Sequence, residues 1–218
     1  MPSLRTLLFN LLVFLLVSCR DSGLKHNEVQ KVDKRKWAIT LKDSLTKITI
    51  ELPNRFDTML VWTHYSCGIP YYKIRIQEKA LPIHEEGGFF DTQIPKQKSQ
   101  ITFVQQTPSS KTNVPTRQSI ERRHWDRVKE SENDPQAVQT QFDSIVIVNN
   151  QTYSVFANCL RYQKEQLYMQ TLETEIFTKR GTVKLIIEQT DKNLPMNRMI
   201  FVQASLDIIK SLRVDDGI

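Results

Sequence analysis

The 218-residue sequence contains few of the residues on which common catalytic and cofactor sites depend. It has only six glycines, and it contains no GxSxG sequence, no glycine-rich phosphate loop and no CxxC pair. A backbone cradle for phosphate needs glycines at fixed spacing, so the low glycine content argues against a nucleotide loop. We therefore predict no catalytic residue, no metal ligand and no cofactor from motifs.

Cysteine is also scarce, with three in the whole chain. Cys67 and Cys159 are too far apart in sequence for a short metal-binding motif, and two thiols do not make a disulfide framework. A chain of this length can also build a sufficient core without disulfides. A Cys67–Cys159 disulfide and two buried thiols both remain open.

The third cysteine, Cys19, follows a short hydrophobic run. Residues 7–17 are all apolar except Asn10, and eleven residues are too few for a membrane-spanning helix, which needs about 20. The run has the length of the apolar core of a secretory signal peptide, about 7–15 residues. It ends in Leu16-Val17-Ser18-Cys19.

These four residues resemble the bacterial lipobox. The resemblance implies that the Cys19 thiol receives a diacylglycerol and that cleavage follows Ser18, whereas the alternative is a plain signal peptide followed by a chance cysteine. By the sorting rule for such lipoproteins, Arg20 after the anchor points to the outer membrane of a Gram-negative bacterium. We thus predict a signal peptide (1–18), a lipidated cysteine and flexible tether (19–36) and a single folded domain (37–218).

The chain is basic, with a formal net charge of +6 and a pI near 9.2. A basic surface attracts nucleic acid or another anionic partner. An exported protein rarely meets nucleic acid, so the charge favours an anionic lipid or polysaccharide over nucleic acid as a partner. A charge that only keeps the protein soluble is the simpler interpretation, and it explains the composition without any partner.

Alternating apolar residues predict an antiparallel sheet. The strands are expected at 38–41, 46–52, 58–63, 72–76, 101–104, 144–148, 152–162, 167–177 and 182–188. The segment 144–148 is apolar on both faces and is expected to be a central strand. A helix is predicted from Thr116 to Glu130 and a second from Pro195, with one face made of Met199, Val202, Leu206, Ile209 and Leu212. This order of elements predicts an α+β domain.

The two ends of the predicted domain resemble the PsbP-like superfamily. The opening hairpin is WAITLKDSLTKITIELP, and the closing strand and helix are GTVKLIIEQ and FVQASLDIIKSLRV. The resemblance implies a central antiparallel sheet with helices on both sides, an α/β/α sandwich, and a non-catalytic role in binding or assembly. It covers packing residues alone, so it transfers no functional residue.

The segment VWTHYSCGIPYY, residues 61–72, is the richest in aromatic side chains. Aromatic rings give large contact areas at low entropic cost, so we predict a binding surface made of Trp62, His64, Tyr65, Tyr71 and Tyr72. The alternative is that these rings pack in the core.

The predicted function is that of a membrane-anchored, non-catalytic envelope lipoprotein that binds a protein, glycan or lipid. The alternative is a small envelope hydrolase that uses Cys67 or the pair Glu85 and Glu86. His84-Glu85-Glu86 begins like a zinc motif, but Gly88 occupies the place of its second histidine, so no metal is predicted there.

Overall fold

A computed structural model describes residues 33–42, 46–66, 69–82, 97–106, 115–133, 140–162, 166–179, 181–192 and 194–215. The chain divides into two units, Met1–Val32 and Asp33–Ile218, and every described residue belongs to the second. The predicted lipid attachment residue Cys19 and the alternative catalytic residues Cys67, Glu85 and Glu86 lie outside the described residues. Among those described, no helix combines the length and apolar character needed to cross a membrane.

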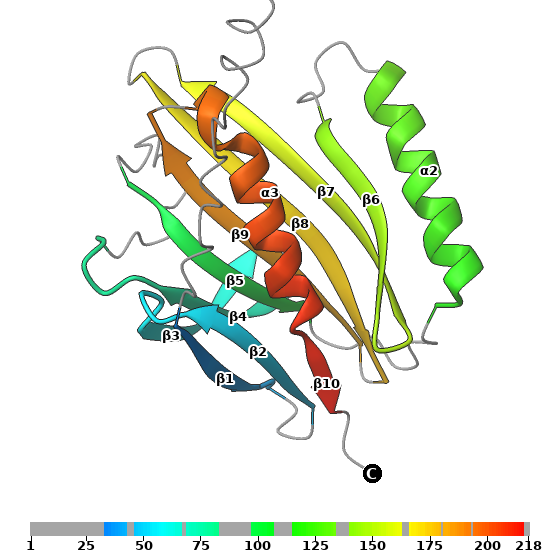
Figure 1. The fold of residues 1–218 in the computed structure, drawn as a ribbon. Coiled ribbons are helices and arrows are strands. Elements are labelled where there is room, and N and C mark those ends of the chain that lie inside the picture. The colour runs from blue at the N-terminus through cyan, green and yellow to red at the C-terminus, as the bar shows by residue number, and fades with distance from the viewer. Residues whose placement is uncertain are drawn as a thin grey trace, which may run out of the picture. The chain divides into compact units, whose positions relative to one another are not determined.

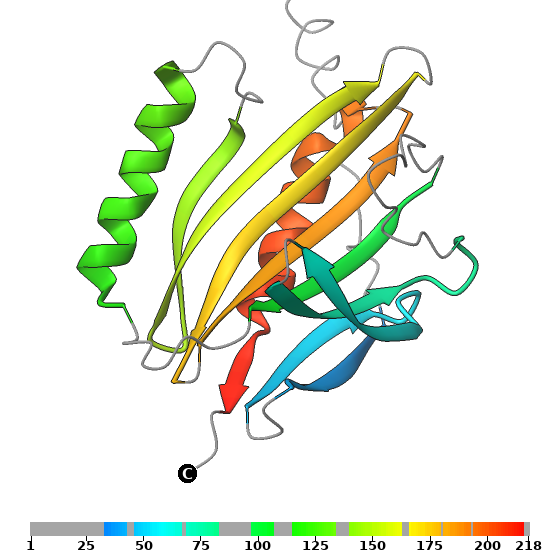
Figure 2. The same cartoon turned by 180° about the vertical axis from the view of Figure 1, so that it is seen from behind.

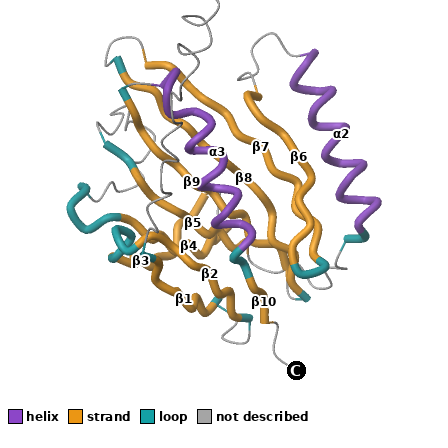
Figure 3. The backbone as a smooth tube through the Cα atoms, viewed as in Figure 1, coloured by secondary structure: helices purple, strands orange, loops and turns teal. Residues whose placement is uncertain are grey.

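Two antiparallel sheets form the framework of this unit (Figures 1 and 3). The larger sheet has the strand order β3-β4-β5-β9-β8-β7-β6, and the smaller has the order β1-β2-β10. The strands of the larger sheet are β3 (Thr58–Ser66), β4 (Ile69–Gln77), β5 (Ser99–Gln106), β6 (Thr140–Val148), β7 (Gln151–Tyr162), β8 (Leu167–Thr178) and β9 (Gly181–Asp191). Those of the smaller sheet are β1 (Lys34–Thr40), β2 (Lys47–Pro53) and β10 (Arg213–Asp215).

Strands β6 to β9 form the meander that the sequence predicts. Asn149 and Asn150 connect β6 to β7 with φ angles of 50° and 62°. Two successive positive φ angles define a type I′ turn, whose twist matches that of the flanking strands. Gly181, at the start of β9, has a φ of 143°, a backbone conformation that residues other than glycine rarely adopt.

The core lies on one face of the larger sheet. Helix α3 (Leu194–Lys210) runs along this face in Figure 1, and the smaller sheet contributes to the same apolar cluster. The fully buried side chains come from both sheets and include Ile48, Ile50, Leu52, Ile74, Ile76, Ile101, Phe103, Leu172, Ile176 and Leu185. Burial of this apolar surface is the main driving force for folding.

Helix α2 (Arg117–Asn133) packs against β6 and β7 on the opposite face of the larger sheet. Thr116 caps it as predicted, because its Oγ1 accepts a hydrogen bond from the backbone N–H of Ser119 at 3.3 Å. Ile120 and His124 are buried on its inner face, and Val128 is half-buried. The described part of the chain is thus a mixed α+β fold with helices on both faces of an antiparallel sheet.

The sequence pattern does not predict β10, and three further details differ from the sequence prediction. Strand β1 begins at Lys34, so the last three residues of the predicted tether are strand residues paired with β2. The segment 144–148 lies in β6, which is an edge strand rather than a central one. Its apolar residues on both faces have a different cause, since one face meets the core and the other lies on the α2 side, where Ile147 remains 51% exposed.

The third correction concerns α3. Val202, Ile209 and Leu212 are buried as predicted, and Leu206 is partly buried, but Met199 is 68% exposed. The buried face also includes Phe201, Ser205 and Ile208. The face is therefore rotated from the predicted stripe, because Phe201 and Ile208, which sequence periodicity left out, point to the sheet.

Ile209 anchors α3 to the sheet, which generates a stability prediction. Ile209→Ala removes a fully buried side chain from the core cluster, and such a truncation destabilises a domain by about 2–5 kcal/mol. Met199→Ala on the exposed side of the same helix should change stability by less than about 0.5 kcal/mol. Urea denaturation followed by circular dichroism measures both, and equal stabilities for the two variants would contradict this packing.

Candidate ligand-binding groove

Figure 2 shows the face of the larger sheet that lies opposite α3. Polar and charged side chains lie on this face. Strand pairing places residues of five adjacent strands in one row across this face. In order from the edge the row contains Trp62, Lys73, Val104, Lys184 and Glu175. Side chains alternate between the two faces of a strand, so the neighbours of these residues along each strand point to the core face.

A groove of about 490 Å³ lies on this row and on the rows at either side of it. It extends from the end of β3 and the start of β4 toward α2. Its described lining residues are His64, Tyr71, Lys73, Val104, Arg123, Glu175, Thr182, Lys184 and Ile186. Ligand pockets in proteins commonly measure about 300–1,000 Å³, so the groove has room for a small ligand or part of a chain-like one.

Among the described residues that line the groove, basic side chains outnumber acidic ones. Lys73, Arg123 and Lys184 are basic, and Glu175 is acidic. The Lys184 Nζ lies 2.8 Å from Glu173 Oε2, and the Arg123 Nη1 lies 4.0 Å from Glu175 Oε2. These side chains are half-exposed, except for the more buried Glu173. Water screens such pairs, which leaves the cations accessible to an anionic ligand.

A second hollow of about 340 Å³ adjoins the first between α2 and strands β7 and β8. Here Arg127 extends over the Phe156 ring at 4.1 Å from its centre, and its Nη2 lies 3.6 Å from Glu173 Oε2. Arg123 lies 5.4 Å from the centre of the Phe177 ring. Contact with an aromatic face orients a guanidinium group, so α2 presents two positioned arginines to this face of the sheet.

His124 fixes α2 on the sheet. Its side chain is fully buried, its Nδ1 is 3.0 Å from Ser154 Oγ, and its ring centre is 4.7 Å from that of Phe156. Its Nε2 lies 3.4 Å from Asp143 Oδ1, but these atoms are not aligned as a hydrogen bond. Since Arg123 is the adjacent residue, the position of His124 also determines where the groove-lining arginine lies.

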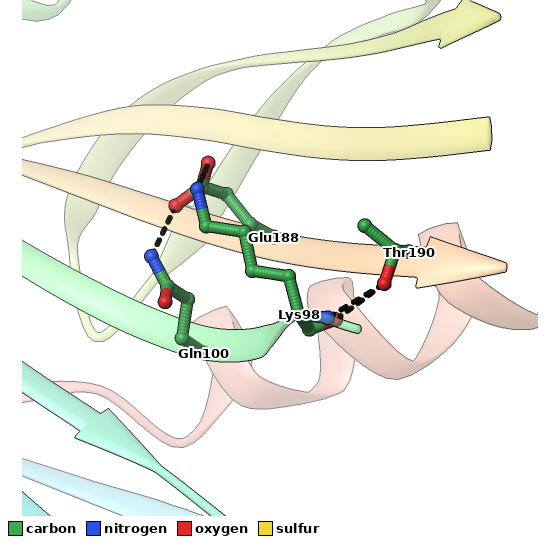
Figure 4. A network of polar contacts seen from close by, with 4 residues as sticks. All are labelled: Lys98, Gln100, Glu188 and Thr190. Carbon is green, nitrogen blue, oxygen red and sulfur yellow. Dashed lines mark hydrogen bonds and ion pairs between the residues drawn. The ribbon is translucent and has the colours of Figure 1, made fainter. Parts of the chain in front are cut away.

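A network of polar side chains lies on the same face, near the start of β5 and the end of β9 (Figure 4). Glu188 accepts hydrogen bonds from Lys98 Nζ at 2.5 Å and from Gln100 Nε2 at 2.7 Å. The Lys98 backbone N–H donates to Thr190 Oγ1 at 2.6 Å. Gln100 is buried, and Lys98 and Glu188 are largely so. The polar groups at this end of the face therefore bond to one another, whereas the groove at the other end is open to solvent.

Two side chains outside the groove have displaced pKa values. Burial raises the pKa of Tyr153 to about 12, so the phenol stays protonated and donates a hydrogen bond to Gln151 Oε1 at 2.7 Å. A hydrogen bond from the backbone N–H of Lys79 lowers the pKa of Asp57 and helps to join the start of β3 to the segment after β4. Both groups therefore have structural roles.

The predicted binding residues divide between the two faces of the sheet. His64 and Tyr71 line the groove. Trp62 lies on the same face and is half-buried, with the Arg75 guanidinium 4.9 Å from its ring centre. The structure thus brings three of the five predicted residues to the groove side.

Tyr65 and Tyr72 lie on the core-side face. Tyr72 is partly buried and packs against the core cluster, which is the alternative role considered for these rings. Tyr65 is 71% exposed near the end of β3. Trp62 and Tyr65 are three positions apart on one strand, so alternation places them on opposite faces and they do not form a common patch.

Sequence reasoning missed Lys73, Arg123, Lys184 and Glu175 as groove residues. Alternation already placed Lys73 on the polar face of its strand, and a signal for Lys184 exists in the alternating sequence TVKLII. The predicted helix 116–130 carries charges of both signs, and no local pattern shows that Arg123 faces the sheet. The strand order and the docking of α2 bring these four residues together.

The described residues contain no group of three or more His, Cys, Asp or Glu side chains placed to hold a metal ion. Cys159 is half-buried in β7. The chain matches no protein-family model, no curated protein and no solved structure. The groove is therefore interpreted from its own geometry.

The role of His124 in holding α2 on the sheet can be tested by mutation. His124→Ala removes a buried ring and leaves Ser154 without its partner, so we expect a loss of about 2–4 kcal/mol in unfolding free energy. The exposed neighbour provides a control, since Arg122→Ala should change stability by less than about 0.5 kcal/mol. Chemical denaturation followed by tryptophan fluorescence gives both values. An unchanged midpoint for His124→Ala would show that α2 does not depend on this contact.

Proposed function

We propose that the protein is a membrane-anchored envelope lipoprotein that binds an anionic glycan in the groove, without catalysis. The observation that carries the binding role is the groove itself, with Lys73, Arg123 and Lys184 around it and the rings of His64 and Tyr71 in its wall. Cations attract carboxylate, sulfate or phosphate groups on a ligand. An aromatic side chain beside them offers an apolar face to a sugar ring.

The lining favours a glycan over the lipid that sequence reasoning also left open. Val104 and Ile186 are the only aliphatic residues among the described residues that line the groove. An acyl chain needs a continuous apolar slot, because each methylene group gains about 0.8 kcal/mol only when it leaves water. A polar ligand loses little by lying in this mixed, half-open groove.

The size of the groove argues for a small or chain-like ligand rather than a protein. A stable protein interface typically buries about 800 Å² on each partner, with aromatic anchors at its centre. The groove is instead a narrow, charged feature of pocket size. These properties support an acidic oligosaccharide.

The anchoring part of the proposal rests on the sequence Leu16-Val17-Ser18-Cys19. A single acyl chain binds a membrane reversibly, whereas two or three chains hold a protein stably. An acylated Cys19 would therefore keep the domain at the membrane, and Arg20 supports the outer membrane as its location. The protein would then contact the bilayer only through the acyl chains on Cys19.

We also propose that the fold is related to that of the PsbP-like superfamily. Helices on opposite faces of an antiparallel sheet support it, as does the opening hairpin β1–β2. The non-catalytic roles implied by that resemblance agree with a binding function.

The binding role predicts a charge-dependent interaction. We expect a hexamer of galacturonic acid to bind the full chain in isothermal titration calorimetry at 50 mM salt and to bind more weakly at 300 mM salt. Arg123→Glu should weaken binding at least about tenfold, equivalent to about 1.4 kcal/mol. The control Arg122→Glu changes the same charge on the exposed side of α2 and should change affinity by less than about twofold.

A neutral hexamer of glucose should not bind. Three results would reject the glycan proposal: no binding of the acidic hexamer, equal effects of the two arginine variants, or capture of the Cys19→Ala chain by phosphatidylglycerol vesicles that Arg123→Glu abolishes and Arg122→Glu does not. The last result would assign the basic surface to lipid headgroups.

The anchor predicts a separate outcome in cells. Cys19→Ala should abolish incorporation of labelled palmitate and leave the protein released or as an unprocessed precursor. The wild-type chain should carry the label and sediment with membranes. Equal labelling of both chains would contradict acylation at Cys19.

A further inference from the structure

The two edges of the larger sheet are protected differently. Strand β6 forms one edge and packs against α2. Strand β3 forms the other edge and pairs with β4 on one side. Within the described part of the chain, no strand pairs with the outer side of β3. An unpaired edge presents a row of backbone donors and acceptors to another strand.

Strand β3 also lacks the features that commonly block pairing at an edge. Its nine residues, TMLVWTHYS, include no lysine, no other charged residue and no proline. Its pairing with β4 runs without a register shift from Thr58 to Ser66. Natural edge strands usually carry a charge, a proline or a bulge that prevents association, and none of these occurs within β3.

Three large apolar side chains lie on one face of this edge. Met59, Val61 and Tyr65 are 43%, 48% and 71% exposed, and all three point to the core-side face of the sheet. They occupy the border of the core rather than its interior. Exposed apolar side chains grouped along one strand commonly mark an interaction surface.

We propose that β3 pairs antiparallel with β3 of a second copy of this chain. In a register centred on Trp62, Met59 of each copy lies opposite Tyr65 of the other, and Val61 lies opposite Thr63. Apolar cross-strand pairs of this kind stabilise a sheet. The absence of charge on β3 means that self-pairing brings no like charges opposite one another, so the strand is complementary to itself.

This pairing has a geometric consequence for the groove. The two-fold axis of an antiparallel strand pair stands perpendicular to the sheet, so the same face of both copies points the same way. His64 belongs to β3 and lines the groove. The two grooves of the dimer therefore lie on one continuous face, on either side of the paired edges.

The expected affinity is low. A nine-residue strand edge offers less than the roughly 800 Å² per partner of a standard interface, so the dissociation constant should be micromolar. If the chain is held at a membrane, as proposed above, its raised local concentration favours the dimer. The pairing itself does not depend on that anchor or on the glycan.

Sedimentation equilibrium of the full chain in density-matched detergent tests the proposal, from 1 to 200 µM protein. We expect a monomer–dimer equilibrium for the wild type and at least a tenfold larger dissociation constant for Val61→Lys. Ile147→Lys is the matched control, because it places the same charge at a similarly exposed residue of the other edge strand. It should leave the equilibrium unchanged.

Hydrogen exchange of the unmodified protein gives an independent measurement. Amides of β3 that point away from β4 should exchange rapidly at 1 µM and become protected at 200 µM. A monomer at all concentrations would overturn the proposal, as would a dimer that is unaffected by Val61→Lys or that forms without protection of β3. The first result would leave the edge for a strand of another protein.

Discussion

The larger sheet has one apolar face that must be covered, and the arrangement of the described elements follows from this constraint. Helix α3 and the smaller sheet cover that face with aliphatic and aromatic side chains. The C-terminal strand β10 pairs with β2, so the end of the chain completes the smaller sheet. Since the core is complete on this side, the opposite face is free to carry charge.

The opposite face is only partly covered. Helix α2 lies over β6 and β7, and the network around Glu188 occupies the far ends of β5 and β9. Between them, side chains from five strands remain available to a ligand. The groove therefore exists because α2 covers only β6 and β7, and because alternate side chains of β4, β8 and β9 point to this face.

Much of the fold could be predicted because each residue pattern has a local cause. Alternation of apolar and polar residues predicted β2 and β4 as strands. The position of β6 could not be predicted in this way. A run of apolar residues is expected both in a central strand and in an edge strand that a helix covers. The groove also depended on strand order, which brings Lys73 near Lys184 across more than a hundred residues of sequence. His64 and Tyr71 were found from composition, but Arg123 required the docking of His124.

We propose that the α2-side face of the larger sheet binds ligand, whereas the α3-side face is structural. A two-dimensional NMR titration of the isotope-labelled full chain with the galacturonic acid hexamer tests it directly. The account predicts shifts in the amide signals of Lys73, Val104, Lys184 and Arg123, with those of β2 and α3 unchanged. Shifts concentrated in α3 or in the smaller sheet would contradict it.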